Sequence, residues 1–440
     1  MKNQIQLITA ITPVRQSLNR SLRRHTLTIG VTFIITTLML SAAAVWAAPQ
    51  GTWSSTGSMS VGRFVFTATT LQNGKVLVVG GATDTENATA TAELYDPATG
   101  AFSATGSMHD ARVGFSAIRL SNGKVLVEGG ASNTVAALAS AELYDPATGM
   151  WTVTGNMSQG RQQHSAVLLR NGNVLVSGGN IDRTPCADVC FTTIGGSEIY
   201  DPSTGQWTTV GEMTIPRSFF TTTLLPNGRV LAVGGRVHTG PDYFDYKAIA
   251  FADLYAPATG KWKPTGTMTI SREDHSTVLL NNGQVLAIGG TTVDFNGVTV
   301  ASTELYDPAT GAWTATGTML QGRERQTATV LQNGQVLIAG GDYYDGVNAG
   351  FLTECELYNP AVGTWSVTAS MTTPRYGARA ALLRDGRVLE AGGDTDFSGI
   401  PTASAELYTP LTAAQGMNRA DCGTTLLDAT TAGQTNEINK

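Results

Sequence analysis

The sequence predicts an all-β protein, a seven-bladed propeller in which residues near the start of the chain complete the last blade. A blade is one four-stranded sheet of the ring. Two observations predict this fold. A pattern of about fifty residues recurs seven times between residues 51 and 410, a period typical of radially repeated sheets. Glycine also accounts for 50 of the 440 residues and only 14% are charged, which indicates a turn-rich β chain.

Four markers recur in a fixed order: an arginine, a glycine pair, a tyrosine and then an aromatic residue. The arginines are Arg63, Arg112, Arg161, Arg217, Arg272, Arg323 and Arg375. The glycine pairs begin at Gly80, Gly129, Gly178, Gly234, Gly289, Gly340 and Gly392. The tyrosines are Tyr95, Tyr144, Tyr200, Tyr255, Tyr306, Tyr358 and Tyr408. An aromatic residue follows only six of these tyrosines: Phe102, Trp151, Trp207, Trp262, Trp313 and Trp365.

The first unit shows where its four strands lie. We expect them at residues 66–72, 75–81, 91–97 and 101–105. The first two are joined by Asn73-Gly74, a signal for a two-residue hairpin turn, and Asn-Gly or Asp-Gly recurs at this point in every unit. The second strand, KVLVVGG, is almost entirely apolar, as expected for a strand buried on both faces between neighbouring sheets.

The seventh unit lacks its outer strand. It ends at ELYTP (406–410), and no tryptophan follows. The sequence GTWSS (51–55) matches the missing strand and has no tyrosine segment before it. We therefore predict that Trp53 lies in the same sheet as Tyr408. Backbone hydrogen bonds between the two chain segments would then close the ring and leave no open edge.

The spacing of these markers resembles that of the kelch repeat in all seven units. The resemblance covers residues 51–410 and implies a kelch-type propeller of the galactose oxidase/kelch superfamily, of the exported bacterial type. We expect the propeller at residues 51–415 and a polar tail at 416–440. Kelch propellers commonly act as binding or scaffold modules without chemistry, so the resemblance implies an interaction module.

The N-terminal residues 1–47 are typical of an export signal. Four arginines precede a segment without charge, residues 26–48, and small residues lead up to a cleavage point after Ala47. The alternative is an uncleaved anchor, since the segment is long enough to span a bilayer, and only then would the protein contact a membrane. Either reading predicts an exported protein that is periplasmic, secreted or on the cell surface. The net charge of −6, with no basic tract, excludes nucleic acid as a partner.

The two faces of the ring differ in their connections. The turns between first and second strands and between third and fourth strands are short and nearly invariant. The loops between second and third strands are long and different, as in residues 180–195, 236–250 and 342–354. We call the two ends of the ring the turn face and the loop face. Varied loops on a rigid scaffold favour function on the loop face.

The repeated arginines and the acids of the ELY segments have a structural interpretation. The acids are Glu93, Glu142, Glu198, Asp253, Glu304, Glu356 and Glu406. One arginine and one acid per blade, both near the same end of their strands, predict seven ion pairs that support the scaffold. Function is then expected at positions that break the repeat.

The residues just after each arginine are such positions, because there the inner strand enters the central opening. Aromatic residues are expected from Phe64, Phe66, Phe115, Phe219, Phe220 and Tyr376. A polar arc is expected from Gln163, His164, Glu273, Asp274, His275, Glu324 and Arg325. The loops add Asp294-Phe295, Tyr343 within DYYD (342–345), and DTDF (394–397). Aromatic faces beside carboxylates suit a sugar, while the alternative is a set of solvated groups around a water-filled channel.

Two enzymatic alternatives follow from resemblance. The segments beginning RQQH and REDH resemble the part of galactose oxidase that carries a Tyr-His copper pair, which places His164 and His275 at the copper-binding histidine. Gln163 and Asp274 stand where that family has the tyrosine, so the axial ligand is missing and we expect no cofactor and no metal.

A sialic-acid mutarotase is the other alternative, because exported bacterial kelch propellers include such enzymes. Glu273 or Glu324 would be its general acid or base, and Arg325 would hold the substrate carboxylate. We favour a monomeric binding module for a carbohydrate or protein ligand on the loop face.

Four cysteines are candidates for disulfides in an exported protein. Cys186 and Cys190 could close a small ring within one loop, and Cys355 and Cys422 could attach the tail to blade six. The spacing alone does not decide the connectivity.

Overall fold

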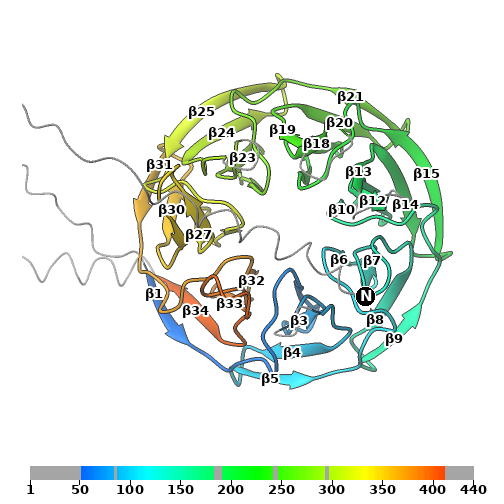
Figure 1. The fold of residues 1–440 in the computed structure, drawn as a ribbon, viewed down its shortest axis with the longest axis horizontal. Coiled ribbons are helices and arrows are strands. Elements are labelled where there is room, and N and C mark those ends of the chain that lie inside the picture. The colour runs from blue at the N-terminus through cyan, green and yellow to red at the C-terminus, as the bar shows by residue number, and fades with distance from the viewer. Residues whose placement is uncertain (1–50, 84–86, 183–190, 241–245, 293–296, 412–440) are drawn as a thin grey trace, which may run out of the picture.

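The computed structural model describes residues 51–411, except for residues 84–86, 183–190, 241–245 and 293–296. Its strands form seven four-stranded antiparallel sheets around a central axis, which confirms the predicted fold (Figure 1). In this part of the chain no helix is long and apolar enough to cross a membrane. The predicted signal segment, the tail, Cys186, Cys190 and Cys422 lie outside the described residues.

Each blade is a meander that runs from the central axis outwards. Blade 1 is β2 (Thr67–Thr70), β3 (Val76–Val79), β4 (Ala92–Asp96) and β5 (Ala101–Ala104); blade 2 is β6 (Ser116–Arg119), β7 (Val125–Glu128), β8 (Ala141–Asp145) and β9 (Met150–Val153). Blade 3 is β10 (Ser165–Leu168), β11 (Val174–Ser177), β14 (Gly196–Asp201) and β15 (Gln206–Glu212); blade 4 is β16 (Thr221–Leu224), β17 (Val230–Val233), β20 (Ala252–Ala256) and β21 (Lys261–Pro264).

The other three blades repeat this order. Blade 5 is β22 (Ser276–Leu279), β23 (Val285–Ile288), β24 (Ser302–Asp307) and β25 (Ala312–Thr318); blade 6 is β26 (Thr327–Val330), β27 (Val336–Ala339), β30 (Glu356–Asn359) and β31 (Thr364–Val367). Blade 7 is β32 (Arg379–Leu382), β33 (Val388–Ala391), β34 (Ala405–Pro410) and, as its outer strand, β1 (Gly51–Ser55).

Strand β1 closes the ring as predicted. Trp53 lies opposite Tyr408 in the β1–β34 register, and their ring centroids are 5.2 Å apart. The Trp53 indole donates a hydrogen bond to the Ala369 carbonyl at 2.9 Å, which ties blade 7 to blade 6. The first and last described strands lie side by side in Figure 1.

The hydrophobic core is divided among the seven seams, where a seam is the contact between neighbouring blades. Each seam holds one cluster of buried side chains, built mainly from the second strands and the repeated tyrosines. Strand β3, for example, is buried at all four residues because blades lie against both of its faces. A single blade could not cover these faces alone, so the blades stabilise one another.

The glycine pairs are needed where neighbouring blades approach. Gly80 has φ +67°, and a Cβ on it would lie 2.7 Å from the Phe115 ring of the next blade. A side chain at this position would therefore be strained and would clash with the neighbouring blade.

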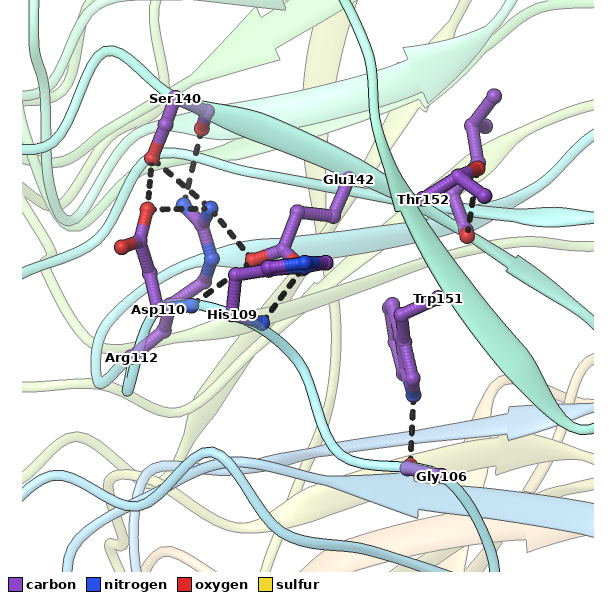
Figure 2. Close-up of polar contacts among 9 residues, drawn as sticks. Gly106, His109, Asp110, Arg112, Ser140, Glu142, Trp151 and Thr152 are labelled. Atoms are coloured by element: carbon purple, nitrogen blue, oxygen red, sulfur yellow. Dashed lines mark hydrogen bonds and ion pairs between the residues drawn. The ribbon is translucent and has the colours of Figure 1, made fainter.

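The predicted ion pairs are present in all seven blades. Arginine–carboxylate distances range from 2.6 to 3.3 Å, and every one of these arginines is buried. In blade 2, Arg112 also donates to the Ser140 carbonyl at 2.9 Å (Figure 2). It donates to the Gly129 carbonyl at 2.9 Å as well. The arginine thus joins the second and third strands of its blade.

Three of the long loops contain hairpins that the sequence analysis treated only as loops. They are β12 (Asn180–Asp182) with β13 (Phe191–Thr193), β18 (Arg236–His238) with β19 (Tyr246–Ala248), and β28 (Asp342–Tyr344) with β29 (Ala349–Phe351). These hairpins lie on the loop face of blades 3, 4 and 6. Two of them bring Arg236 and Phe351 into contact with Phe219 and Tyr376 at the inner ends of the blades.

Candidate functional site

A ring of residues in the left-handed conformation lines the loop-face end of the central channel. In every blade, the residue two positions after the repeat arginine has a φ angle between +50° and +64°. These residues are Val65, Gly114, Gln163, Phe219, Asp274, Arg325 and Gly377. Five of the seven are not glycine, and such a conformation costs about 1 to 3 kcal/mol for a residue with a side chain. Because this conformation recurs in all seven blades, it belongs to the repeat, and what differs between blades is the side chain that it carries.

Backbone hydrogen bonds join this ring across the seams. Gln163 donates its N–H to Gly114 at 3.0 Å, Phe219 to Gln163 at 3.2 Å, Asp274 to Phe219 at 3.3 Å, and Arg325 to Asp274 at 3.0 Å. Because residues of neighbouring blades bond directly here, they lie at the inner rim of the ring. Their side chains therefore determine what the mouth, meaning the loop-face end of the channel, presents to a ligand.

Large side chains occur on one side of this rim only. Gln163, Phe219, Asp274 and Arg325 come from blades 3 to 6, whereas blades 7, 1 and 2 contribute Gly377, Val65 and Gly114. The mouth is therefore asymmetric, as the sequence analysis expected.

The centre of the polar side is an ion pair between blades 5 and 6. Arg325 binds one carboxylate oxygen of Asp274 through both Nη2, at 2.9 Å, and Nε, at 3.0 Å. The two side chains keep 22% and 14% of their surface exposed, so a ligand can reach both. The Arg325 guanidinium carbon also lies 5.0 Å from the Tyr376 ring centroid, which connects the charged and aromatic sides.

Two carboxylates lie directly opposite each other in blade 6. Glu324 and Asp342 form an antiparallel bridge with backbone N···O distances of 3.0 and 3.1 Å. Burial, together with the charge of Asp342, holds the pKa of Glu324 well above its usual range. Burial and the nearby Asp396 raise the pKa of Asp394 in blade 7 to about 6. Protonated carboxyl groups can donate as well as accept hydrogen bonds.

Arg236 borders the mouth in blade 4. Its guanidinium carbon lies 3.9 Å from the Phe219 ring centroid and 4.3 Å from that of Tyr246, and its Nε is 3.6 Å from a carboxylate oxygen of Glu273. Glu273 is buried beneath it. Arg236 stands in one of the varied loops, and no sequence pattern marks it as a site residue, because its acid neighbour Glu273 is distant in the sequence.

The aromatic side is a stack of four rings from three blades. Phe64 and Tyr376 have centroids 5.3 Å apart, Tyr376 and Phe351 5.1 Å, and Phe351 and Phe397 4.7 Å. Phe64 and Tyr376 are buried by the stack, whereas Phe397 at its end is 56% exposed. Tyr343 lies half-buried in the same β28–β29 hairpin as Phe351, opposite Gly350.

Some residues expected at the mouth are instead buried in the seams. In six of the seven blades, the residue three positions after the repeat arginine packs against the glycine pair of the preceding blade. The prediction that Phe66, Phe115 and Phe220 form part of the mouth surface is therefore wrong, since all three are buried at this position.

His164 and His275 occupy the same repeat position. The His164 side chain is 0% exposed and lies 3.3 Å from a Glu128 carboxylate oxygen, and His275 is 3.2 Å from the Thr221 hydroxyl. Burial and, secondarily, the repeat arginines lower the pKa of both histidines to about 3. The two histidines lie in different seams, 2/3 and 4/5, so the residues present do not fit a shared copper centre.

Of the predicted candidates, the structure therefore brings together Glu273, Asp274, Glu324, Arg325 and Tyr376, with Gln163 further along the rim. Cys355 is buried and makes no disulfide within the described ranges; its proposed partner, Cys422, lies outside them. Searching residues 51–411, apart from the four gaps, finds no group of three or more His, Cys, Asp or Glu that could hold a metal ion.

The repeat geometry agrees with the comparison to known families. The KLHDC2/KLHL20/DRC7 Kelch-repeats domain matches residues 123–341. The chain is a kelch-repeat protein. With the seven sheets and their closure, this kelch protein is a seven-bladed propeller.

Similar curated proteins also carry kelch repeats. Kelch-like protein terF of Aspergillus terreus is 26% identical over 42% of each chain, and the F-box/kelch-repeat protein At1g67480 of Arabidopsis thaliana is 30% identical over 28% of this chain and 31% of that protein. Human Kelch-like protein 23 is 28% identical over 46% of this chain and 34% of its own length. The kelch protein thus spans less than half the length of these relatives.

Two solved structures share the fold. A fungal alcohol oxidase of the AA5 family, in complex with copper, superposes with a TM-score of 0.64 at 20% identity, over 83% of this chain and 78% of the other. YjhT superposes with a TM-score of 0.53 at 16% identity, over 68% and 97%. At these identities the likeness shows the fold alone.

Proposed function

We propose that this kelch propeller is a binding module that takes a carbohydrate ligand at the mouth on its loop face. The asymmetry of the mouth is the observation on which the proposal rests. The Arg325–Asp274 pair and the Glu324–Asp342 bridge present hydrogen-bonding groups on one side, and the ring stack that ends at Phe397 presents an apolar face on the other.

A sugar matches both sides of such a mouth. Its C–H faces pack against aromatic rings, and its hydroxyls both donate and accept hydrogen bonds. Carboxyl groups whose pKa is raised, such as that of Asp394, can return both kinds of bond. A protein ligand would need a broader surface, and exposed Phe397 and Ile400 are the apolar groups it would cover.

A sugar-active enzyme such as a mutarotase is a second proposal, favoured by one observation. Glu324, whose pKa is raised, and Arg325, which is charged, are adjacent in the sequence and both face the mouth region. A carboxyl group with raised pKa next to a guanidinium suits general acid/base catalysis on an anionic sugar. Following anomer exchange of free sugars with and without the protein, and with Glu324→Gln, tests this alternative.

The binding proposal is tested by a glycan array with the purified kelch protein. We expect a defined set of glycans to bind, and Phe397→Ala to weaken that binding without changing thermal stability, because this ring is largely exposed. Val153→Ala is the matched control, since Val153 is 60% exposed on the outer strand β9. Array binding that is absent, or that both variants leave intact, would contradict the proposal.

Export also belongs to the proposal. An exported protein with residues 1–47 removed would meet free glycans outside the cell, and a single ring can act as a monomer. N-terminal sequencing of the mature protein and its elution volume in size-exclusion chromatography test the cleavage and the monomeric state.

A further inference from the structure

One position of the channel wall breaks the repeat in blade 7. The innermost strand of every other blade begins with a small hydroxyl residue: Thr67, Ser116, Ser165, Thr221, Ser276 and Thr327. Strand β32 begins instead with Arg379. Blade 7 therefore places a guanidinium where the other six blades have a small hydroxyl side chain.

The Arg379 guanidinium has no acid partner in the part of the chain that the structure describes. Its Nη1 donates only to the backbone carbonyls of Ala378, at 2.9 Å, and Gly377, at 3.5 Å. Each of the seven scaffold arginines, by contrast, has a carboxylate oxygen within 3.3 Å. The remaining N–H groups of Arg379 are thus available to a ligand in the channel.

Among the described residues, the acids near Arg379 contact other groups instead. Asp274 binds Arg325 through two short contacts, and Glu390 accepts a hydrogen bond from the Thr327 hydroxyl at 2.9 Å. Burial lowers the pKa of Arg379, while the charges of Glu390 and Asp274 oppose this effect and that of Arg325 adds to it. A half-buried cation in this setting gains from an additional anion.

Blades 7 and 1 together supply aromatic side chains next to Gly377, in the same segment as this cation. Gly377, two residues before Arg379, has no side chain, and the Phe64 ring fills the space that a Cβ would take, at 2.3 Å from its built position. Phe64 in turn stacks on Tyr376. A ligand at Arg379 would therefore have a guanidinium and the edge of the ring stack on adjacent sides.

Resting on the carbohydrate function proposed above, we infer that the ligand is an acidic sugar and that Arg379 binds its carboxylate. A planar guanidinium pairs with a carboxylate through two parallel N–H···O bonds. The nearby carboxylate of Asp274 disfavours a doubly charged anion such as phosphate, because it repels each added negative charge. A single carboxylate on an uncharged sugar body fits both constraints.

The test compares two monosaccharide probes that differ only at C6, galacturonic acid with its carboxylate and galactose with a hydroxymethyl group, by isothermal titration calorimetry. We expect the wild-type protein to bind the acid at least about tenfold more tightly, the size of effect that a charge-assisted pair supplies. Arg379→Ser restores the residue found in blades 2, 3 and 5, so it should fold normally, and it should remove this preference while affinity for the neutral probe stays. Arg379→Lys, which keeps the charge without the planar fork, should retain part of the preference.

The outcomes separate the two proposals. Equal binding of both probes to the wild-type protein, or a preference that survives Arg379→Ser, would overturn the role of Arg379 and leave the carbohydrate proposal standing. Displacement of the acid probe by inorganic phosphate at equal concentration would overturn the assignment to a carboxylate. If neither these probes nor any glycan on the array binds, the carbohydrate function itself is wrong.

Discussion

At the scale of single residues, the molecule uses the same side chain for two purposes. Arginines at the repeat position are buried with an acid partner and support the scaffold, whereas Arg236, Arg325 and Arg379 occupy positions where other blades have different residues. Two acids break the repeat in the same way. Glu128 and Glu390 are buried in the second strands of blades 2 and 7. The equivalent positions in the second strands of the other blades are mostly apolar.

Glu390 predicts a pH dependence of stability. Burial raises its pKa to about 7, and the hydrogen bond from Thr327 and the charges of the nearby arginines only partly offset this. The folded protein therefore holds a proton that the unfolded chain releases near its ordinary value of 4.5, so stability falls as the pH rises from about 4.5 to 7. The loss is on the order of 3 kcal/mol.

Glu390→Gln tests this prediction, because an amide keeps the acceptor for Thr327 and carries no charge. Relative to the wild-type protein, the variant should gain unfolding free energy at pH 8 and show little difference at pH 5 in urea titrations. Parallel pH profiles for the two proteins would show that Glu390 does not titrate in this range.

At the scale of the strand, six of the seven seams contain the same hydrogen bond between a tyrosine and a threonine hydroxyl, and the seam between blades 3 and 4 does not. In six seams the repeated tyrosine hydroxyl lies within 2.9 Å of a threonine hydroxyl of the preceding blade, as for Tyr200 and Thr154 at 2.8 Å. In the seam between blades 3 and 4, Val210 replaces the threonine, and the buried Tyr255 hydroxyl has no partner among the described residues.

Val210→Thr should therefore stabilise the protein by about 1 kcal/mol, the net worth of a hydrogen bond that satisfies a buried hydroxyl. The reciprocal change, Thr154→Val, removes the partner of Tyr200 and should destabilise the protein by a similar amount. Thermal unfolding of both variants measures this pair of effects, and a fall in melting temperature for Val210→Thr would refute the assignment.

At the scale of the whole molecule, stability depends on closure by β1. This strand pairs with β34 over five residues and contributes Trp53 to the seam cluster that contains Tyr408. Trp53→Ala removes the packing and the hydrogen bond to Ala369, and we expect a loss of about 3 to 5 kcal/mol. Native-state hydrogen exchange should then show blade 7 opening first; uniform protection across all blades would argue against a closing role for β1.

The sequence predicted the parts of the molecule that repeat. Period and markers were enough for the seven blades, the arginine–acid pairs and the closure by Trp53, because each depends on equivalent positions in successive units. The loop hairpins and the left-handed rim were missed. Valine and phenylalanine rarely adopt a positive φ, so Val65 and Phe219 gave no sign of this conformation. Only Gly114 and Gly377 are of a residue type that favours it.

The site was predicted in part for the same reason. The three residues after each repeat arginine include Asp274, Glu324 and Arg325, which do lie together at the mouth. The side chains of these three successive residues face different directions, however. His164 and Phe115 are adjacent in sequence to rim residues and yet lie in seams. The acid nearest to the Arg236 guanidinium, Glu273, is far away along the chain, and Arg379 bonds only to neighbouring backbone carbonyls, so no local pattern could identify either arginine.

The separation of scaffold and mouth is tested most directly by two arginines only two residues apart. Arg323 is buried against Glu356 at 3.1 Å, and Arg325 lies on the rim. Measured by thermal unfolding and by binding to the same glycans, Arg323→Ala should cost about 3 to 5 kcal/mol of stability, since it leaves a buried carboxylate unpaired. Arg325→Ala should leave the melting temperature nearly unchanged and abolish binding. Equal destabilisation by both changes, with glycan binding intact in Arg325→Ala, would contradict the account.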